Sequence, residues 1–356
     1  MTQSKKILVL GASGKTGGAS ALQLLTDSIP VRAFVHRLDE RSEMLKQAGA
    51  EIFLGSVSDF DSISTALIGI KRVYFVAPWT PEQLHLAMTF AVAAAQSELE
   101  VIVCVTQWLG QPQHPSLATR QSYLTDQIFD MIPNVEVIKI NTGWFADNYM
   151  QPDLMAMISQ LGIFPFPLGN GRAAPISNQD IGRVVAAALL NPEPYVGKTL
   201  RPTGPKSLSP EDLVQTFSKV MGRPVKYDDI SEKLFLKALG TMGMTTHMQA
   251  QLKHYVKEYQ GGAFAGVTTV VKDMTGQEPE NFELIVRRYV SQNDITKPKI
   301  TNKLRAIIGF ISLLFTKQAD LVQFEHDSGY PVVMSPKLGL DYASWVETHP
   351  IQENVA

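Results

Sequence analysis

Cysteine is almost absent from this chain of 356 residues, and neither sign of charge predominates. The single cysteine, Cys104, excludes an intrachain disulfide framework and a cysteine-based metal cluster. Charged residues make up 19% of the chain and the net charge is −2, so no global basic field attracts nucleic acid or a membrane. With 45% hydrophobic residues, these features indicate a globular protein that buries a sizeable core.

Targeting features are also missing. No apolar stretch of about 7–15 residues followed by a small-residue cleavage site precedes the first expected strand. We therefore expect a cytoplasmic protein. An apolar segment near the C-terminus, Leu304–Phe315, is too short for a bilayer core of about 30 Å, so we expect no transmembrane segment.

Familiar catalytic motifs are lacking as well. None of the ten tyrosines has a lysine four residues later, and the chain contains neither G-x-S-x-G nor H-E-x-x-H. The catalytic residues are therefore unknown at this point, with Tyr123 and His114 as weak candidates for a proton donor. The alternative is packing for Tyr123 and a solvent-exposed loop for His114. His247 and His254 have no carboxylate at metal-ligand spacing, so we expect both to be structural and no metal to be bound.

What the chain does contain is an alternation of short apolar runs with segments of helical periodicity over its first 140 residues. The runs are nearly continuously apolar, as buried parallel strands are. Strands are expected at Ile7–Leu10, Val31–Val35, Glu51–Leu54, Arg72–Ala77, Val101–Thr106 and Val135–Ile140. Helices are expected at Lys15–Thr26, Asp39–Ala48, Asp61–Ile68, Pro81–Gln96 and Ser116–Met131. This order predicts an α/β fold with a doubly wound parallel Rossmann sheet, covering residues 1–150.

A glycine-rich turn follows the first expected strand. It is built from Gly11, Ala12, Ser13, Gly14, Lys15, Thr16 and Gly17. The first glycine permits a tight turn, the second lets a pyrophosphate approach the backbone, and the third lets helix and strand pack closely. The N–H groups of the helix N-terminus then face phosphate oxygens. A P-loop is excluded because it would need a glycine where Val9 stands.

The end of the second expected strand reads His36-Arg37 where NAD enzymes usually have a carboxylate. A guanidinium pairs with a 2′-phosphate that a carboxylate would repel. We therefore expect NADP(H) to be preferred over NAD(H). The alternative is that Arg37 is a solvated loop residue, and the nearby Asp39 leaves that alternative open.

Ligands of open α/β sheets lie outside the carboxyl ends of the strands. This rule places further cofactor contacts at Ser56, Ala77, Pro78, Trp79, Thr106 and Phe145. Trp79 and Trp144 either stack on the cofactor or substrate, or belong to the core.

The alternation of short apolar runs with helical segments ends after Gly143. Residues 164–171 read as a loop, Ser177 as the N-cap of a helix running to about Leu190, and Lys198–Thr203 as a strand. We expect residues 151–295 to form a smaller, mixed and mostly helical substrate-binding domain, with parts of 175–205 rejoining the first domain. Residues 296–356 form an extension with the apolar helix Leu304–Phe315. This helix either docks on its own domain or a dimer partner, or lies as a basic helix at a membrane interface.

The sequence resembles the NmrA-like family of atypical short-chain dehydrogenase/reductases. The likeness rests on residues 11–17, Arg37, residues 64–69 before 73–78, residues 141–148 and residues 201–205. Residues 275–282 are similar to the T-G-x-x-P-x-x-F of the festuclavine/agroclavine dehydrogenase branch. The resemblance covers about residues 5–292 and adds Asn148 to the cofactor contacts. Two positions depart from the family: Thr142 replaces a proline, and Ser122 replaces a lysine that touches the nicotinamide ribose.

The resemblance implies an NADP(H)-binding Rossmann domain in either a reductase or a redox sensor. We expect an NADPH-dependent reductase of a small molecule, a quinone, enone or iminium ion, because such acceptors take a hydride without a strong general acid. The alternative is a non-catalytic NADP(H) sensor that acts through a protein partner. A homodimer is compatible with either. The missing tyrosine acid argues against a nucleotide-sugar epimerase.

Overall fold

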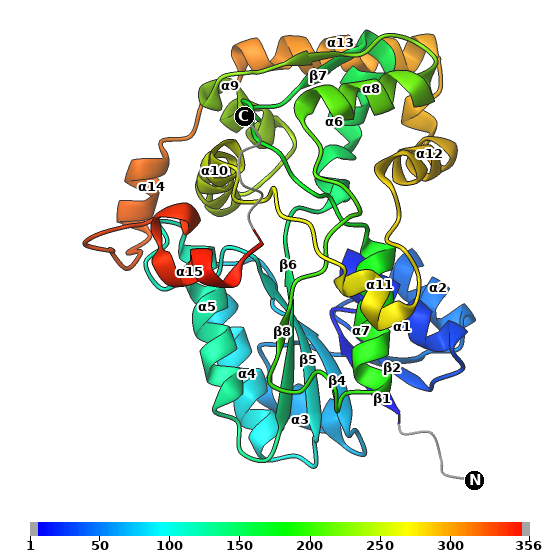
Figure 1. Ribbon diagram of the computed structural model, residues 1–356, viewed down its shortest axis with the longest axis vertical. Coiled ribbons are helices and arrows are strands. Elements are labelled where there is room, and N and C mark those ends of the chain that lie inside the picture. Colours follow the sequence, from blue (N-terminus) through cyan, green and yellow to red (C-terminus); the bar gives the residue numbers. More distant parts are fainter. Residues whose placement is uncertain (1–5, 351–356) are drawn as a thin grey trace.

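A parallel sheet flanked by helices forms one half of the molecule, and a mostly helical second part covers the carboxyl end of that sheet (Figure 1). The computed structural model describes residues 6–350. Residues 1–5 and 351–356 lie outside the described residues. The expectation that the chain has no signal peptide rests partly on residues 1–5.

The main sheet has the strand order β3-β2-β1-β4-β5-β6-β8, and every neighbouring pair is parallel. The strands are Ile7–Leu10 (β1), Val31–Val35 (β2), Glu51–Leu54 (β3), Arg72–Val76 (β4), Val101–Gln107 (β5), Glu136–Thr142 (β6), Ile163–Pro165 (β7), Thr199–Leu200 (β8) and Lys226–Asp228 (β9). Strands β1 to β6 follow the doubly wound order 3-2-1-4-5-6, which confirms the predicted Rossmann fold. β8 extends this sheet, although it is shorter than the expected strand over Lys198–Thr203.

The described helices alternate with these strands and then form the second part of the molecule (Figure 1). They are Lys15–Thr26 (α1), Glu40–Gln47 (α2), Phe60–Leu67 (α3), Gln83–Ala95 (α4), Leu117–Asp130 (α5), Pro152–Ala156 (α6), Asn178–Leu190 (α7), Pro210–Met221 (α8), Glu232–Thr241 (α9), Thr246–Gly261 (α10), Val270–Thr275 (α11), Phe282–Gln292 (α12), Ile300–Phe315 (α13), Leu321–Asp327 (α14) and Ala343–Thr348 (α15). The N-cap expected at Ser177 is present, since its hydroxyl accepts from the Asp180 N–H at 3.0 Å.

Two apolar cores lie on opposite faces of the main sheet because successive strand residues point to opposite sides. Ile7 and Val9 face the core beneath α1 and α7, whereas Leu8 and Leu10 face the core beneath α3, α4 and α5. α1 and α7 pack closely, because Gly182 has no side chain: a Cβ there would lie 2.7 Å from the Ala19 carbonyl carbon. The covered faces leave the carboxyl edge of the sheet for a ligand.

The second part has its own core, built largely from aromatic rings. Phe164, Phe166 and Phe282 surround Tyr149, which is fully buried, and Phe217 packs against Phe164 and Phe282. The expected loop over residues 164–171 is wrong in its first residues, since β7 pairs there with β9 in a second, two-stranded sheet. Pairing with β9, about 60 residues later in the chain, could not be seen locally.

The C-terminal extension wraps the molecule. α13 lies across the end farthest from the main sheet, and α14 and α15 descend toward α5 (Figure 1). Trp345 of α15 is buried, and its indole N–H donates to the Trp108 carbonyl at 2.8 Å. None of the helices in residues 6–350 is long and apolar enough to span a bilayer.

Candidate active site

The glycine-rich turn between β1 and α1 has the shape that a diphosphate needs. Gly11 adopts a positive φ of 66°, and a Cβ at Gly17 would overlap the Gly11 carbonyl oxygen. The helix therefore starts close against the strand end because both positions are glycine.

The N-terminus of α1 carries no side-chain cap. Gly14 occupies the N-cap position and is exposed, and no side chain of residues 6–350 caps the first N–H groups of the helix. These groups and the positive end of the helix dipole fit an anionic phosphate. Lys15 adds a positive charge, with its Nζ 3.0 Å from Asp147 Oδ2, and Thr16 accepts a hydrogen bond from the Tyr74 hydroxyl at 2.8 Å.

Two guanidinium groups meet at the end of β2. Arg37 Nε lies 3.2 Å from Asp39 Oδ2, and Arg41 Nη2 lies 2.6 Å from the same oxygen. Asp39 also caps α2, accepting from the Arg41 and Ser42 N–H groups. The Arg41 hydrogen bond lowers the pKa of the Asp39 carboxyl to about 2. The carboxylate is thus engaged by its own helix, and the cluster of Arg37, Arg41 and Asp39 carries one net positive charge.

Arg41 was missed by the sequence analysis. The signal was present, because an aspartate that caps a helix turns the next residues of that helix toward itself.

Ser56, at the end of β3, is exposed and shares a hydrogen bond of 2.7 Å with Ser58. It does not line the cleft described below, and neither does Pro78.

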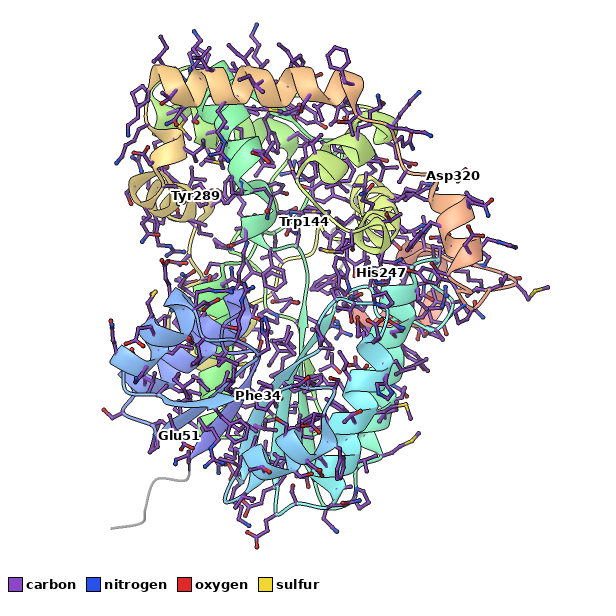
Figure 2. The ribbon with its side chains drawn as sticks, turned by 180° about the vertical axis from the view of Figure 1, so that it is seen from behind. Phe34, Glu51, Trp144, His247, Tyr289 and Asp320 are labelled. Atoms are coloured by element: carbon purple, nitrogen blue, oxygen red, sulfur yellow. The ribbon has the colours of Figure 1, made fainter. Side chains whose placement is uncertain are left out.

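A cleft of about 1020 Å³ opens where the main sheet meets the second part of the molecule. Six of the expected cofactor contacts line it, namely Thr16, Ala77, Trp79, Thr106, Phe145 and Asn148. Figure 2 places Trp144, another residue of the cleft wall, between the two halves of the molecule. Trp144 is also 5% exposed and part of the second core, so it serves both as cleft wall and as core residue.

Three buried polar atoms on cleft-lining residues have no hydrogen-bond partner in the described part of the chain. They are the indole nitrogens of Trp79 and Trp144 and the side-chain oxygen of Gln83. Buried polar atoms are costly when they lack a partner, so these three call for one from water or from a ligand. The cleft therefore offers two donors and one acceptor in largely apolar surroundings.

Tyr255 and Gln107 both line the cleft and form a hydrogen-bonded pair that was not predicted from the sequence. The Tyr255 hydroxyl donates to Gln107 Oε1, and the Tyr255 ring meets Trp79 edge to face at 5.3 Å. Burial raises the pKa of the Tyr255 phenol, so the phenol stays protonated at neutral pH. No local pattern reveals this pair, because 148 residues separate its members.

A second, more apolar pocket of about 650 Å³ adjoins the cleft through shared wall residues. Trp144, Asn148, Leu252 and Tyr255 line both cavities. The remaining wall comes mainly from α6, α9 and α10, including Leu154, Phe235, Leu239 and Val256. The arrangement can hold a planar apolar molecule next to a ligand in the cleft.

The two candidate proton donors lie outside the walls of both cavities. On α5 it is Ser122, not Tyr123, that lines the cleft, and Ser122 accepts from Gln83 Nε2 at 2.8 Å. The expectation of a solvent-exposed His114 is wrong. His114 is fully buried, with Nε2 3.0 Å from Glu258 Oε1 and Nδ1 accepting from the Ser116 N–H.

His247 is buried and hydrogen-bonds Tyr330 through Nδ1. Burial also lowers the pKa of the His254 imidazole to about 3, which suits a packed rather than a titrating side chain. Within residues 6–350, no three His, Cys, Asp or Glu side chains are grouped so as to hold a metal ion.

The fold and the glycine turn are those of the Rossmann class. The NmrA-like family model matches residues 3–103 and 134–283, more than half of the chain, and the protein belongs to this family. The family expected from the sequence is thereby confirmed.

The similar proteins include an azoreductase and a dehydrogenase. The chain is 25% identical to the NAD(P)H azoreductase of Xenophilus azovorans over 290 residues, which cover 78% of this chain and 95% of the relative. It is 24% identical to festuclavine dehydrogenase of Aspergillus fumigatus over 289 residues, 78% of this chain and 94% of the relative. Among solved structures, the NADPH complex of the NADPH-dependent quinone oxidoreductase QOR2 of Escherichia coli superposes with a TM-score of 0.70 at 17% identity. That match covers 79% of this chain and 99% of the other, and it shows a common fold.

Proposed function

We propose that the protein is an NADPH-dependent reductase of a planar, apolar small molecule such as a quinone, an enone or an iminium ion. The observation that carries the proposal is the open cleft with unpartnered indole N–H groups, which shares wall residues with an apolar pocket. A sensor that only binds the cofactor has no need of this second cavity. The similarity to an azoreductase and to a dehydrogenase supports the same class of reaction.

The residues present fit a nicotinamide dinucleotide. The uncapped N-terminus of α1 would hold the diphosphate, and Thr16, Thr106 and Phe145 would hold the nicotinamide end in the cleft. The cluster of Arg37 and Arg41 supports a preference for NADP(H), since two guanidinium groups outweigh the engaged Asp39. When bound, NADPH would supply a hydride that reduces the acceptor by two electrons.

The chain's own residues orient and shield the acceptor. Trp79 and Trp144 would donate to an acceptor oxygen through their free indole N–H groups. Tyr255 already donates to Gln107, so it is not poised to give a proton to a substrate. The proton that completes reduction of a quinone to a hydroquinone therefore comes from water, which suits acceptors that take a hydride before they are protonated.

The test is oxidation of NADPH, followed by its absorbance, with a panel of a quinone, an azo dye and a cyclic iminium ion. We expect turnover with at least one acceptor. Trp144→Phe keeps the aromatic ring but removes the donor, and we expect kcat/KM to fall roughly five- to twentyfold, the scale of one hydrogen bond. Tight NADPH binding without turnover on any acceptor would contradict the reductase and favour the sensor.

A further inference from the structure

We propose that α13 is a membrane-docking helix that lays its outer side on a bilayer rich in anionic lipid. Five large apolar residues form a row along this side, spaced by four, four, three and four positions: Ile300, Leu304, Ile308, Ile311 and Phe315. This spacing puts them on one face of a helix. They are 46% to 84% exposed, and Figure 2 shows side chains projecting outward along the helix at the top of the view.

The opposite side of α13 is held firmly by the protein. Ala306 and Leu313 are buried, and the helix contacts α6 and α9. The Asn302 side chain donates to the carbonyls of Asp294 and Lys297 at 2.7 and 3.0 Å. The outer row is thus presented as a fixed surface, and folding of the monomer does not cover it.

The charges beside the row indicate the partner. Lys303 and Arg305 are the sequence neighbours of Leu304. Because each residue of a helix is rotated by about 100° from the one before it, their side chains lie on opposite sides of the apolar row. Both are exposed, and neither forms an ion pair with any described residue, whereas Lys297 and Lys299 are paired with Asp294. An apolar stripe bordered by cations that reach outward matches the interface of an anionic bilayer.

A second copy of the chain fits this surface less well. α13 contains no acidic residue, so two copies pairing their rows would bring Lys303 and Arg305 of each helix together without counter-charges. The helix is also too short to cross a bilayer: its 16 residues span about 24 Å. A helix lying in the plane of the interface satisfies both constraints.

The proposal is tested by flotation of the full-length protein with vesicles of phosphatidylcholine alone or with about 30% phosphatidylglycerol. We expect binding to the anionic vesicles, weakened by salt, and little binding to the neutral ones. Removing both cations in Lys303→Gln/Arg305→Gln should weaken binding about 25-fold, at about fivefold for each cation. Ile308→Glu/Phe315→Glu should weaken it at least tenfold.

The matched control is Ile68→Glu, which changes the 70% exposed C-cap isoleucine of α3, at the opposite end of the molecule from α13 (Figure 1). It should bind vesicles as the wild type does. All variants should keep the wild-type melting temperature, because each replaces exposed side chains. Failure of the wild type to float with anionic vesicles would overturn the proposal. So would a wild-type dimer that Ile308→Glu/Phe315→Glu converts to monomer.

Discussion

At the scale of single residues, the chemistry of the site depends on groups whose partners lie far away in the sequence. Gly11, Gly17 and Arg37 are recognisable from the local pattern because the turn and the strand end that position them are local. Tyr255 with Gln107 and His114 with Glu258 are not, because each pair joins two segments more than 140 residues apart. Only the packed structure shows which of these side chains reach the cleft.

Replacing Arg37 by alanine tests the proposed cofactor preference. The change removes one of two guanidinium groups beside the end of β2, and we expect NADPH binding to weaken by about 1.5–3 kcal/mol, the scale of a charged hydrogen bond. NADH has no 2′-phosphate, so its affinity should stay nearly unchanged. Calorimetric titration of both cofactors distinguishes this result from equal losses, which would place Arg37 away from the cofactor.

Asp126 on α5 provides a pH-dependent prediction. Burial raises the pKa of its carboxyl from 3.8 to about 7. The folded state thus retains a proton that the unfolded state releases, so this group costs stability as the pH rises from about 4 to about 7. Asp126→Asn removes that cost and should stabilise the protein by roughly 1–3 kcal/mol at about pH 8, with a smaller gain at about pH 5. Denaturant unfolding at the two pH values measures this gain in stability. Equal gains at both pH values would contradict the raised pKa of Asp126.

At the scale of elements, the sequence predicted the Rossmann half well because its strands and helices are specified by local periodicity. α1 and β1 to β3 have the predicted bounds, β4 and β5 differ from theirs by one residue at one end, and β6 differs by one or two residues at each end. β8 ends three residues before the expected Thr203. The second part was less predictable. β7 and β9 are three residues each and form only by pairing with each other, so neither has a local signal. The wall of the apolar pocket contributed by α9 and α10 was missed because its residues come together only in the packed structure.

The close approach of β1 and α1 is tested by Gly17→Ala. The added Cβ overlaps the Gly11 carbonyl, so we expect a loss of about 1–3 kcal/mol in unfolding free energy and loss of cofactor binding. Gly309→Ala is the matched control, because a Cβ there meets open space within α13. It should stabilise the protein by about 0.5–1 kcal/mol. A harmless Gly17→Ala would mean that helix and strand do not pack as described.

At the scale of the whole molecule, the C-terminal extension ties the two halves together at the cleft. Trp345 and His349 stack with their rings 4.0 Å apart, and both reach the backbone carbonyl of Trp108, a residue of the cleft wall. The family resemblance ends before this extension, so its role could not be inferred from the sequence.

Trp345→Ala should release the extension. Loss of a buried indole costs about 3–5 kcal/mol. We expect faster limited proteolysis between residues 316 and 343 and a lower melting temperature. Val346→Ala, at a 37% exposed neighbour, should change stability by less than about 0.5 kcal/mol. Equal proteolysis of the two variants would show that the extension is held by other contacts.

The central claim is that the uncapped N-terminus of α1, behind the glycine turn, binds the diphosphate of a nicotinamide dinucleotide. Isothermal titration of the purified wild-type protein with NADPH and NADH tests this claim directly. The account predicts a one-to-one complex with NADPH, tighter than that with NADH and absent in Gly17→Ala. A folded wild-type protein that binds neither dinucleotide would contradict it.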